Sequence, residues 1–181
     1  MWKLLIASLA LVSQLAVAGP KVMFETNLGP FVVELNSEKA PITAANFLKY
    51  VKDGSYVGSQ FHRVIPGFMA QGGGFDKDMK MLKTYAPIKN EASNGLKNEV
   101  ATVAMARTND PDSATRQFFI NYNNNTFLDY DQQPPGYAVF GKVTQGFDVV
   151  KQMATKPTHN VGRYQNVPVQ PIIIINATVL K

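Results

Sequence analysis

Cysteine is absent from the 181-residue chain, and histidine occurs only as His62 and His159. Without cysteine the protein can form no disulfide and carry no lipid on a cysteine. Neither histidine has a second histidine at helical spacing, so the chain offers poor material for a metal site. No serine lies in a nucleophile-elbow context, and there is no thiol nucleophile. The sequence therefore argues against a hydrolase and a metalloenzyme, and it predicts neither metal nor cofactor.

Charge of one sign is not concentrated anywhere in the chain. The formal net charge is +5, and the 18 basic residues are scattered along the sequence. No basic run with interleaved aromatic residues is present, so we expect no nucleic-acid partner. The triple glycine Gly72–Gly74 lacks the spacing of a phosphate-binding or dinucleotide-binding loop and predicts a flexible strand exit instead.

Long hydrophobic runs are also lacking. The apolar stretch Leu4–Val12 is shorter than the roughly 20 residues that a membrane-spanning helix needs. It follows the positive charge of Lys3 and precedes the small-x-small pattern Ala16–Ala18, an arrangement typical of a cleavable signal peptide at residues 1–18. A membrane anchor is the second interpretation. We expect cleavage before Gly19, export to the periplasm and no stable membrane insertion.

The remaining residues, 19–181, have the composition of a single domain with one substantial core, since 45% of the chain is hydrophobic. Apolar residues at helical spacing predict a helix after Pro41 and a second from Gly146 to about Met153. A hairpin is expected within Lys21–Leu35, and a surface loop over Phe75–Asn98. Further short strands are predicted near Gln60–Val64, Phe68–Gly72, Val100–Met105, Gln117–Asn121, Ala138–Val143 and Pro171–Leu180. Many short strands with two helices favour a closed antiparallel barrel.

The most informative segment is FHRVIPGFMAQGG at residues 61–73. Pro66 and Gly67 predict a tight turn between two strands. Because strand side chains alternate between faces, Met69 and Gln71 point the same way. If Arg63 on the preceding strand faces them, a fixed cation lies beside a glutamine and an apolar surface. Such a site suits a substrate that is mostly apolar but contains an amide.

This segment resembles the signature of the cyclophilin-type peptidyl-prolyl cis-trans isomerases. Two further pairs of segments are similar to the family in order and spacing: VAMAR with RQFFI (103–107, 116–120), and FLD with YAVFGKV (127–129, 137–143). The resemblance covers about Lys21 to Lys181. It implies a mainly β fold, a closed eight-stranded antiparallel barrel capped by two α-helices, and proline-containing polypeptides as partners.

The resemblance also implies the site residues. Arg63 and Gln71 are expected to be catalytic, with Gln71 holding the guanidinium in position. An apolar socket is expected to bind the proline ring and consists of Phe68, Met69, Phe119 and Leu128, with Phe127 and Tyr137 along its rim. The groove for the residues before the proline is expected to contain Ala106, Arg107 and Gln117. From composition alone the four socket residues would more often be core; the three matched segments favour the site.

Three positions depart from the commonest eukaryotic pattern of the family. Phe127 stands where tryptophan is frequent, Arg107 where asparagine is frequent, and Tyr137 where histidine is frequent. His62 is interpreted as a histidine whose hydrogen bonds are satisfied near the site, because prolyl isomerisation removes no proton from carbon.

The sequence thus predicts a monomeric periplasmic prolyl isomerase that accelerates slow steps in the folding of exported proteins. A proline-peptide binding module or holding chaperone without significant turnover is the alternative, and mere binding would need the socket but no polarised donor. A small-molecule carrier barrel is a third possibility and would require an empty interior.

Overall fold

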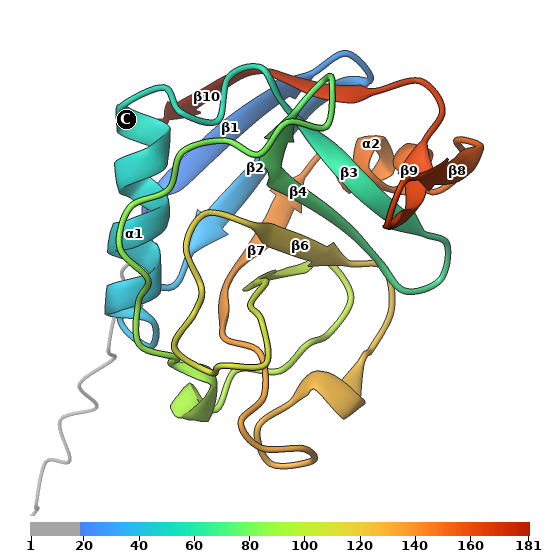
Figure 1. The fold of residues 1–181 in the computed structure, drawn as a ribbon. Helices are drawn as coiled ribbons and strands as arrows, with labels where there is room; N and C mark the ends of the chain where they lie inside the picture. The colour runs from blue at the N-terminus through green and yellow to red at the C-terminus, as the bar shows by residue number, and fades with distance from the viewer. Residues whose placement is uncertain (1–18) are drawn as a thin grey trace, which may run out of the picture.

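The computed structural model describes residues 19–181, which form a closed antiparallel barrel (Figure 1). The predicted signal peptide at residues 1–18 lies outside the described residues. Neighbouring strands follow the order β1-β10-β3-β4-β6-β5-β7-β2 around the barrel, and β8 and β9 form a separate two-stranded sheet. The strands are β1 (Lys21–Thr26), β2 (Gly29–Leu35), β3 (Ser59–Ile65), β4 (Met69–Asp76), β5 (Thr102–Met105), β6 (Phe118–Asn121), β7 (Val139–Gln145), β8 (Thr158–Val161), β9 (Tyr164–Pro168) and β10 (Ile172–Val179). The helices are α1 (Pro41–Lys52), α2 (Phe147–Met153) and the short 3-10 turns η1 (Ala92–Asn94) and η2 (Thr126–Leu128).

Aromatic side chains fill the interior of the barrel. Phe24 and Phe31 stack with their ring centroids 5.2 Å apart, and Phe118 meets the ring of Phe61 edge to face at 5.8 Å. All four rings are at most 1% exposed. Burial of such large apolar groups is the main stabilising contribution to a fold of this size. The carrier-barrel alternative, which required an empty interior, does not fit this core.

Helix α1 covers the barrel with the apolar face that the sequence predicts. Phe47 is fully buried, and its ring centroid lies 4.9 Å from that of Phe140. Ala40 provides no side-chain cap, and the carboxylate of Glu91 from a distant loop accepts the backbone N–H groups of Ile42 and Thr43 at 3.1 and 2.8 Å. A carboxylate at this position satisfies unpaired donors and complements the helix dipole. The loop before η1 is thereby attached to the helix.

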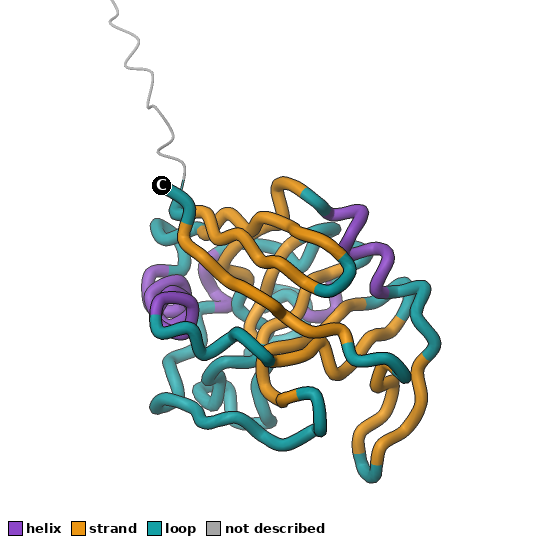
Figure 2. Tube along the Cα trace, turned by 90° about the horizontal axis from the view of Figure 1, so that it is seen from above, coloured by secondary structure: helices purple, strands orange, loops and turns teal. Residues whose placement is uncertain are grey.

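The two α-helices lie outside the ring of strands, as the view from above shows (Figure 2). Helix α1 contacts β10 and β7, whereas α2 contacts β2. Both helices occupy the predicted positions, each starting or ending within a residue or two of the predicted bounds. The predicted two-helix, eight-stranded barrel is confirmed by the described residues.

The triple glycine corrects one prediction. Gly72–Gly74 is not a strand exit, because the three residues are buried inside β4. An added Cβ at Gly73 would lie 2.8 Å from the ring of Tyr56, and one at Gly74 would lie 2.5 Å from Cγ of Gln117. Glycine therefore allows neighbouring side chains to approach the backbone of this strand closely.

The β8–β9 hairpin was not predicted from the sequence. Its two strands are joined by Gly162 and Arg163, and β9 packs beside β3. Gly162 has a φ of 55°, which two-residue hairpin turns commonly require. The hairpin adds a wall next to the strand that carries Arg63.

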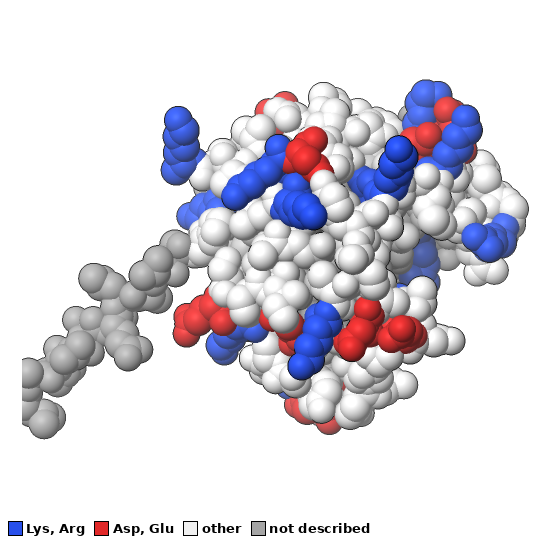
Figure 3. All heavy atoms as spheres, turned by 60° about the vertical axis from the view of Figure 1, so that its left-hand side comes forward, with Lys and Arg blue, Asp and Glu red and all other residues white. Residues whose placement is uncertain are grey.

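Basic and acidic side chains are interspersed on the face drawn in Figure 3, in agreement with the scattered charges of the sequence. Among residues 19–181, no helix combines the length and apolar character needed to cross a membrane.

Candidate active site

A pocket of about 150 Å³ opens beside the β3–β4 hairpin, and we call it the Arg63 pocket. It brings together every predicted site residue except Gln117 and Phe127. Its lining consists of Arg63, Phe68, Met69, Gln71, Ala106, Arg107, Phe119, Leu128 and Tyr137.

Strand register explains why these residues meet. Arg63 on β3 lies opposite Gln71 on β4, and Gln71 in turn lies opposite Phe119 on β6. Cross-strand neighbours share one face of a sheet, so the three side chains project together. The hairpin turn is closed by the N–H of Phe68, which donates to the carbonyl of Ile65 at 3.0 Å, and Gly67 supplies the φ of 74°. The predicted turn at Pro66 and Gly67 thus directs Phe68 to the pocket.

Arg63 is held at one edge of the pocket by a chain of amides. Its Nη1 donates to Oε1 of Gln71 at 3.5 Å, and Nε2 of Gln71 donates to Oε1 of Gln117 at 2.9 Å. The first contact is long, so most of the donor capacity of the guanidinium remains available. Burial lowers the pKa of Arg63, and nearby Tyr137 opposes this shift. An arginine in this environment is still charged at neutral pH.

The opposite wall of the pocket is apolar and firmly packed. Met69 and Phe119 are 2% and 4% exposed and form a small cluster with Ala104 and Val139 that is separate from the main core. Tyr137 meets the ring of Phe119 edge to face, with centroids 5.8 Å apart. The pocket therefore places a rigid hydrophobic surface opposite a partly satisfied cation.

The two remaining predicted residues lie beside the pocket. Phe127 is 55% exposed and packs its ring on that of Phe68, at 5.6 Å between centroids. Gln117 reaches the pocket only through Gln71, and Gly74 leaves it the space to do so. Gln117 is thus placed to position Gln71, and Phe127 to extend the apolar rim.

Comparisons with known proteins agree with this geometry. Residues 21–179 match the model of the family described as "Cyclophilin type peptidyl-prolyl cis-trans isomerase/CLD". A peptidyl-prolyl cis-trans isomerase of Acinetobacter baylyi is 56% identical over 93% of this chain and 90% of its own length. Peptidyl-prolyl cis-trans isomerase A of Dickeya dadantii is 51% identical over 92% of this chain and 87% of its own.

The chain belongs to the cyclophilin family. The predicted prolyl isomerase activity and fold are both confirmed. A crystal structure of a Cryptosporidium parvum cyclophilin has a TM-score of 0.74 and 25% identity over 90% of this chain and 98% of its own. The same protein has been crystallised in the presence of the dipeptide Ala-Pro, with 26% identity over 89% of this chain and 99% of that one. Members of this family bind proline-containing peptides.

Two of the departures from the common cyclophilin pattern contact each other. The guanidinium carbon of Arg107 lies 4.3 Å from the ring centroid of Tyr137, within the range of a cation–π interaction. Nε of Arg107 donates to the carbonyl of Gly136 at 3.0 Å, and the N–H of Tyr137 donates to the carbonyl of Leu128 at 2.9 Å. Arg107 therefore fixes the ring that closes one side of the Arg63 pocket.

A buried polar network supports the loop that carries Leu128, and sequence reasoning missed it. Asn98 donates from its backbone N–H to Asp129 at 2.7 Å, and Asn125 donates to the carbonyl of Phe68 at 2.9 Å and to Asn121 at 2.7 Å. The asparagines and the aspartate are at most 4% exposed. Satisfied buried networks make a loop rigid. The run Asn123–Asn125 was the available signal, since asparagine supplies both donors and acceptors.

Arg116 is a second arginine near the site, and its role was also not predicted. It is 3% exposed, and its guanidinium donates to three backbone carbonyls. The acceptors are Ser55, Gly73 and, at 2.8 Å, Lys83. The group also lies near the rings of Tyr50 and Tyr56. Arg116 thus joins three segments of the cyclophilin fold behind Gln117.

His62 differs from its prediction. It is 4% exposed, as expected of a structural residue, but its Nδ1 has no hydrogen-bond partner among the described residues. Burial lowers the pKa of His62 to about 4, so the ring is neutral at neutral pH. The prediction of a satisfied histidine was therefore wrong, because one ring nitrogen is buried without a partner among the described residues.

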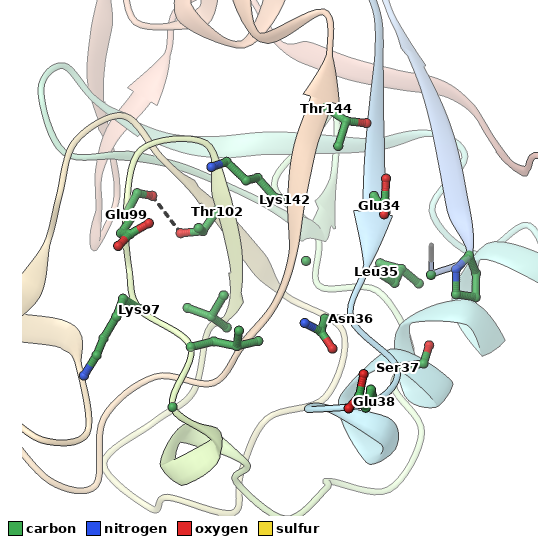
Figure 4. Close-up of a pocket in the computed structure, with 16 residues that line it drawn as sticks. Glu34, Leu35, Asn36, Ser37, Glu38, Lys97, Glu99, Thr102, Lys142 and Thr144 are labelled. Carbon is green, nitrogen blue, oxygen red and sulfur yellow. Dashed lines mark hydrogen bonds between the residues drawn. The ribbon is translucent and has the colours of Figure 1, made fainter. Parts of the chain in front are cut away.

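A larger hollow than the Arg63 pocket lies elsewhere, beside β2 and β7, and we call it the Lys142 hollow (Figure 4). It has a volume of about 770 Å³ and contains none of the predicted site residues. Two of the charged side chains around it are paired: Lys97 with Asp131 at 2.6 Å and Glu34 with Lys21 at 3.5 Å. The hollow therefore contains none of the residues that the three matched sequence segments predict for the site.

Proposed function

We propose that Arg63 is the catalytic donor of this cyclophilin, and that the enzyme accelerates X-Pro isomerisation in exported proteins after cleavage following Ala18. The observation that carries the proposal is that, within residues 19–181, the Arg63 side chain makes a single long hydrogen bond, at 3.5 Å to Gln71, at the edge of an apolar pocket. A cation with unused donors at such a place has capacity for a substrate amide.

The mechanism follows from the electronic structure of the peptide bond. Conjugation between nitrogen and carbonyl gives rotation a barrier of roughly 18–20 kcal/mol. As the bond twists, the prolyl nitrogen becomes pyramidal and its lone pair localises. A donor from Arg63 aimed at this lone pair stabilises the twisted state more than the planar one. Gln71, supported by Gln117, holds the guanidinium plane in register with the amide.

The apolar wall supplies binding. Phe68, Met69, Phe119 and Leu128 surround a volume of about 150 Å³, which is suited to a single proline ring rather than a drug-sized ligand. Tyr137 closes one side, and Ala106 and Arg107 lie along the groove for the residues before the proline. These contacts differ little between the planar ground state and the twisted transition state, so they contribute mainly to affinity.

The alternative is a proline-peptide binding module or holding chaperone in which the same pocket binds without significant turnover. Turnover would then be low in the purified protein, although proline peptides would still bind. A cis/trans exchange assay on residues 19–181 separates the two proposals. We expect exchange at catalytic protein concentrations. Binding without acceleration would favour the holding function.

Export is supported by the charged start, the short apolar run and the Ala-x-Ala ending of residues 1–18. We expect the mature enzyme to be residues 19–181, monomeric and free in the periplasm, with unfolded exported proteins as clients and no nucleic-acid partner. N-terminal sequencing of the periplasmic protein should begin at Gly19. Recovery of intact Met1 in the inner membrane would contradict the localisation.

A further inference from the structure

A second hollow adjoins the Arg63 pocket on the side of the β8–β9 hairpin, and we call it the Arg163 hollow. Its volume is about 420 Å³. Arg63 and Gln71 line both spaces, and Gln117 lines the Arg163 hollow alone. A polypeptide bound in the Arg63 pocket therefore passes the mouth of this second space within a few residues, since an extended chain advances only about 3.3–3.6 Å per residue.

The charge of the Arg163 hollow has one sign. Among the described residues, Arg63 and Arg163 are the charged ones that line it, and no aspartate or glutamate does. Arg163 is exposed on the hairpin turn, where Nη2 donates to the hydroxyl of Tyr164 at 3.1 Å and the guanidinium carbon lies 5.2 Å from the Tyr164 ring. No ion pair involving Arg163 occurs within residues 19–181. The hydrogen bond to Tyr164 keeps the cation beside the hollow and leaves its other donors available.

The floor of the hollow is a row of three rings. His62 meets Phe75 at 4.6 Å between centroids, and Phe75 meets Tyr164 at 5.0 Å. These contacts connect β3, β4 and β9. The rings meet at interplanar angles of 60° and 67°, so the floor is apolar but not flat. It suits the methylene groups of a short side chain, whose polar end then lies near the cations.

His62 contributes ring surface and no charge to the hollow. It lines the hollow and is 4% exposed, and burial lowers its pKa to about 4, so the ring is neutral at neutral pH. Its Nδ1, unpaired among the described residues, is enclosed by the protein. A polar group in the hollow is therefore recognised by the two guanidinium groups, and the ring supplies contact.

We propose that the Arg163 hollow is an accessory subsite for a carboxylate side chain, aspartate or glutamate, located within a few residues of the client's proline. The subsite would make this cyclophilin prefer X-Pro bonds in acidic surroundings. The inference rests on the proposed use of the Arg63 pocket as the proline site, and it adds the chemistry of the neighbouring residue. Arg163 contributes charge, and the floor formed by His62, Phe75 and Tyr164 contributes contact.

The test uses acetylated and amidated peptides with a single X-Pro bond, so that an introduced glutamate is the only carboxylate. Glutamate and its isostere glutamine are placed in turn at successive positions before and after the proline. Exchange rate and peptide affinity are both measured. Because an exposed ion pair contributes up to about 1 kcal/mol, we expect about three- to fivefold preference for glutamate at one position, which weakens at high salt.

Variants then assign the preference. In Arg163→Gln the glutamate-to-glutamine ratio should fall to about one, and in Arg163→Glu a lysine peptide should become preferred. The ratio compares two peptides on the same variant, so a general change in activity cancels. Lys52→Gln, which removes the same charge from an exposed position of α1, should keep the ratio of the unmodified enzyme.

Two results would overturn the inference: equal affinity for glutamate and glutamine peptides at every position, or a preference that survives in Arg163→Gln. Failure of the proposed mechanism would give a different experimental result. If all peptides bind but none is turned over, the assignment of Arg63 as donor fails, while the affinity ratios still decide whether the carboxylate subsite exists.

Discussion

Arg63 and Arg116 carry the same guanidinium group in two neighbouring regions of the barrel, but their surroundings use it in opposite ways. Arg116 is 3% exposed, and its donors are directed to three backbone carbonyls. Arg63 is half-buried and makes one long hydrogen bond to Gln71. A buried cation whose three nitrogens all donate to the backbone supports the fold, whereas one with unused donors in a pocket is available to a substrate. Loss of Arg63 should therefore lower turnover, whereas loss of Arg116 should lower the stability of the fold.

The largest expected effect is on turnover. Arg63→Ala should reduce kcat/KM for an X-Pro peptide by about 10²–10³, which is typical for loss of a preorganised donor to a transition state. Arg63→Lys should restore little, because an ammonium group cannot reproduce the planar fork held by Gln71. A protease-coupled or NMR assay of cis/trans exchange measures this. A loss of less than threefold in kcat/KM would show that the available donors of Arg63 are not used in catalysis.

The complementary effect is on stability. Arg116→Ala removes the donor of three carbonyls, of which the hydrogen bond to Gly73 is buried and the other two are part-buried. A buried polar group left unpaired costs about 1–3 kcal/mol, and truncation of the buried side chain also loses packing. We expect the free energy of unfolding to fall by about 3 kcal/mol in urea titrations. Lys52→Gln serves as the matched control on an exposed surface and should change stability by less than about 0.5 kcal/mol. Equal stability of Arg116→Ala and the control would show that the carbonyls find other partners.

Phe119→Ala sharpens the comparison by changing the apolar wall instead of the cation. Phe119 is 4% exposed and lies opposite Gln71, so its truncation removes contact area and creates a cavity. Peptide affinity and turnover should both fall, and the unfolding free energy should decrease by about 3 kcal/mol. Calorimetric titration with an X-Pro peptide measures the affinity. Retained affinity with lost turnover would reverse the roles assigned to wall and donor.

The smallest effect is expected from a third arginine, Arg107. Its contact with Tyr137 is worth about 0.5–1 kcal/mol at a half-exposed position. Arg107→Ala should therefore reduce kcat/KM only severalfold, and less in a Tyr137→Leu background if the arginine acts through the ring. A double-mutant cycle on kcat/KM provides the coupling energy. Additive losses would show that Arg107 contacts the substrate independently of Tyr137.

Much of the fold and the pocket could be predicted because both depend on local patterns. Alternation in β4 directs Met69 and Gln71 to one face, and Pro66 with Gly67 specifies the turn that brings Arg63 opposite them. The helical spacing of apolar residues, which is also a local pattern, predicted the positions of α1 and α2. Resemblance then connected segments that are distant in sequence.

The features that escaped prediction depend on contacts between distant segments. The carbonyls that accept from Arg116 belong to three segments distant in sequence, and the residues next to Arg116 do not indicate which they are. Gly72–Gly74 looked like a flexible exit because the rings and Gln117 that pack on it are remote in sequence. The β8–β9 hairpin has mostly polar residues, and only Val167 and Pro168 of its two strands are buried, so no apolar alternation indicated it.

The central claim is that Arg63 contributes to the twisted state and little to ground-state binding. The most direct measurement is NMR exchange spectroscopy of an X-Pro peptide with folded Arg63→Ala at a protein concentration near the dissociation constant, which reports affinity and the exchange rate of bound peptide in one sample. Circular dichroism confirms the fold. We predict affinity within about threefold of the unmodified enzyme and an exchange rate about 10²–10³ lower. Near-normal exchange at unchanged affinity would remove Arg63 from the mechanism and leave the apolar wall as the source of catalysis.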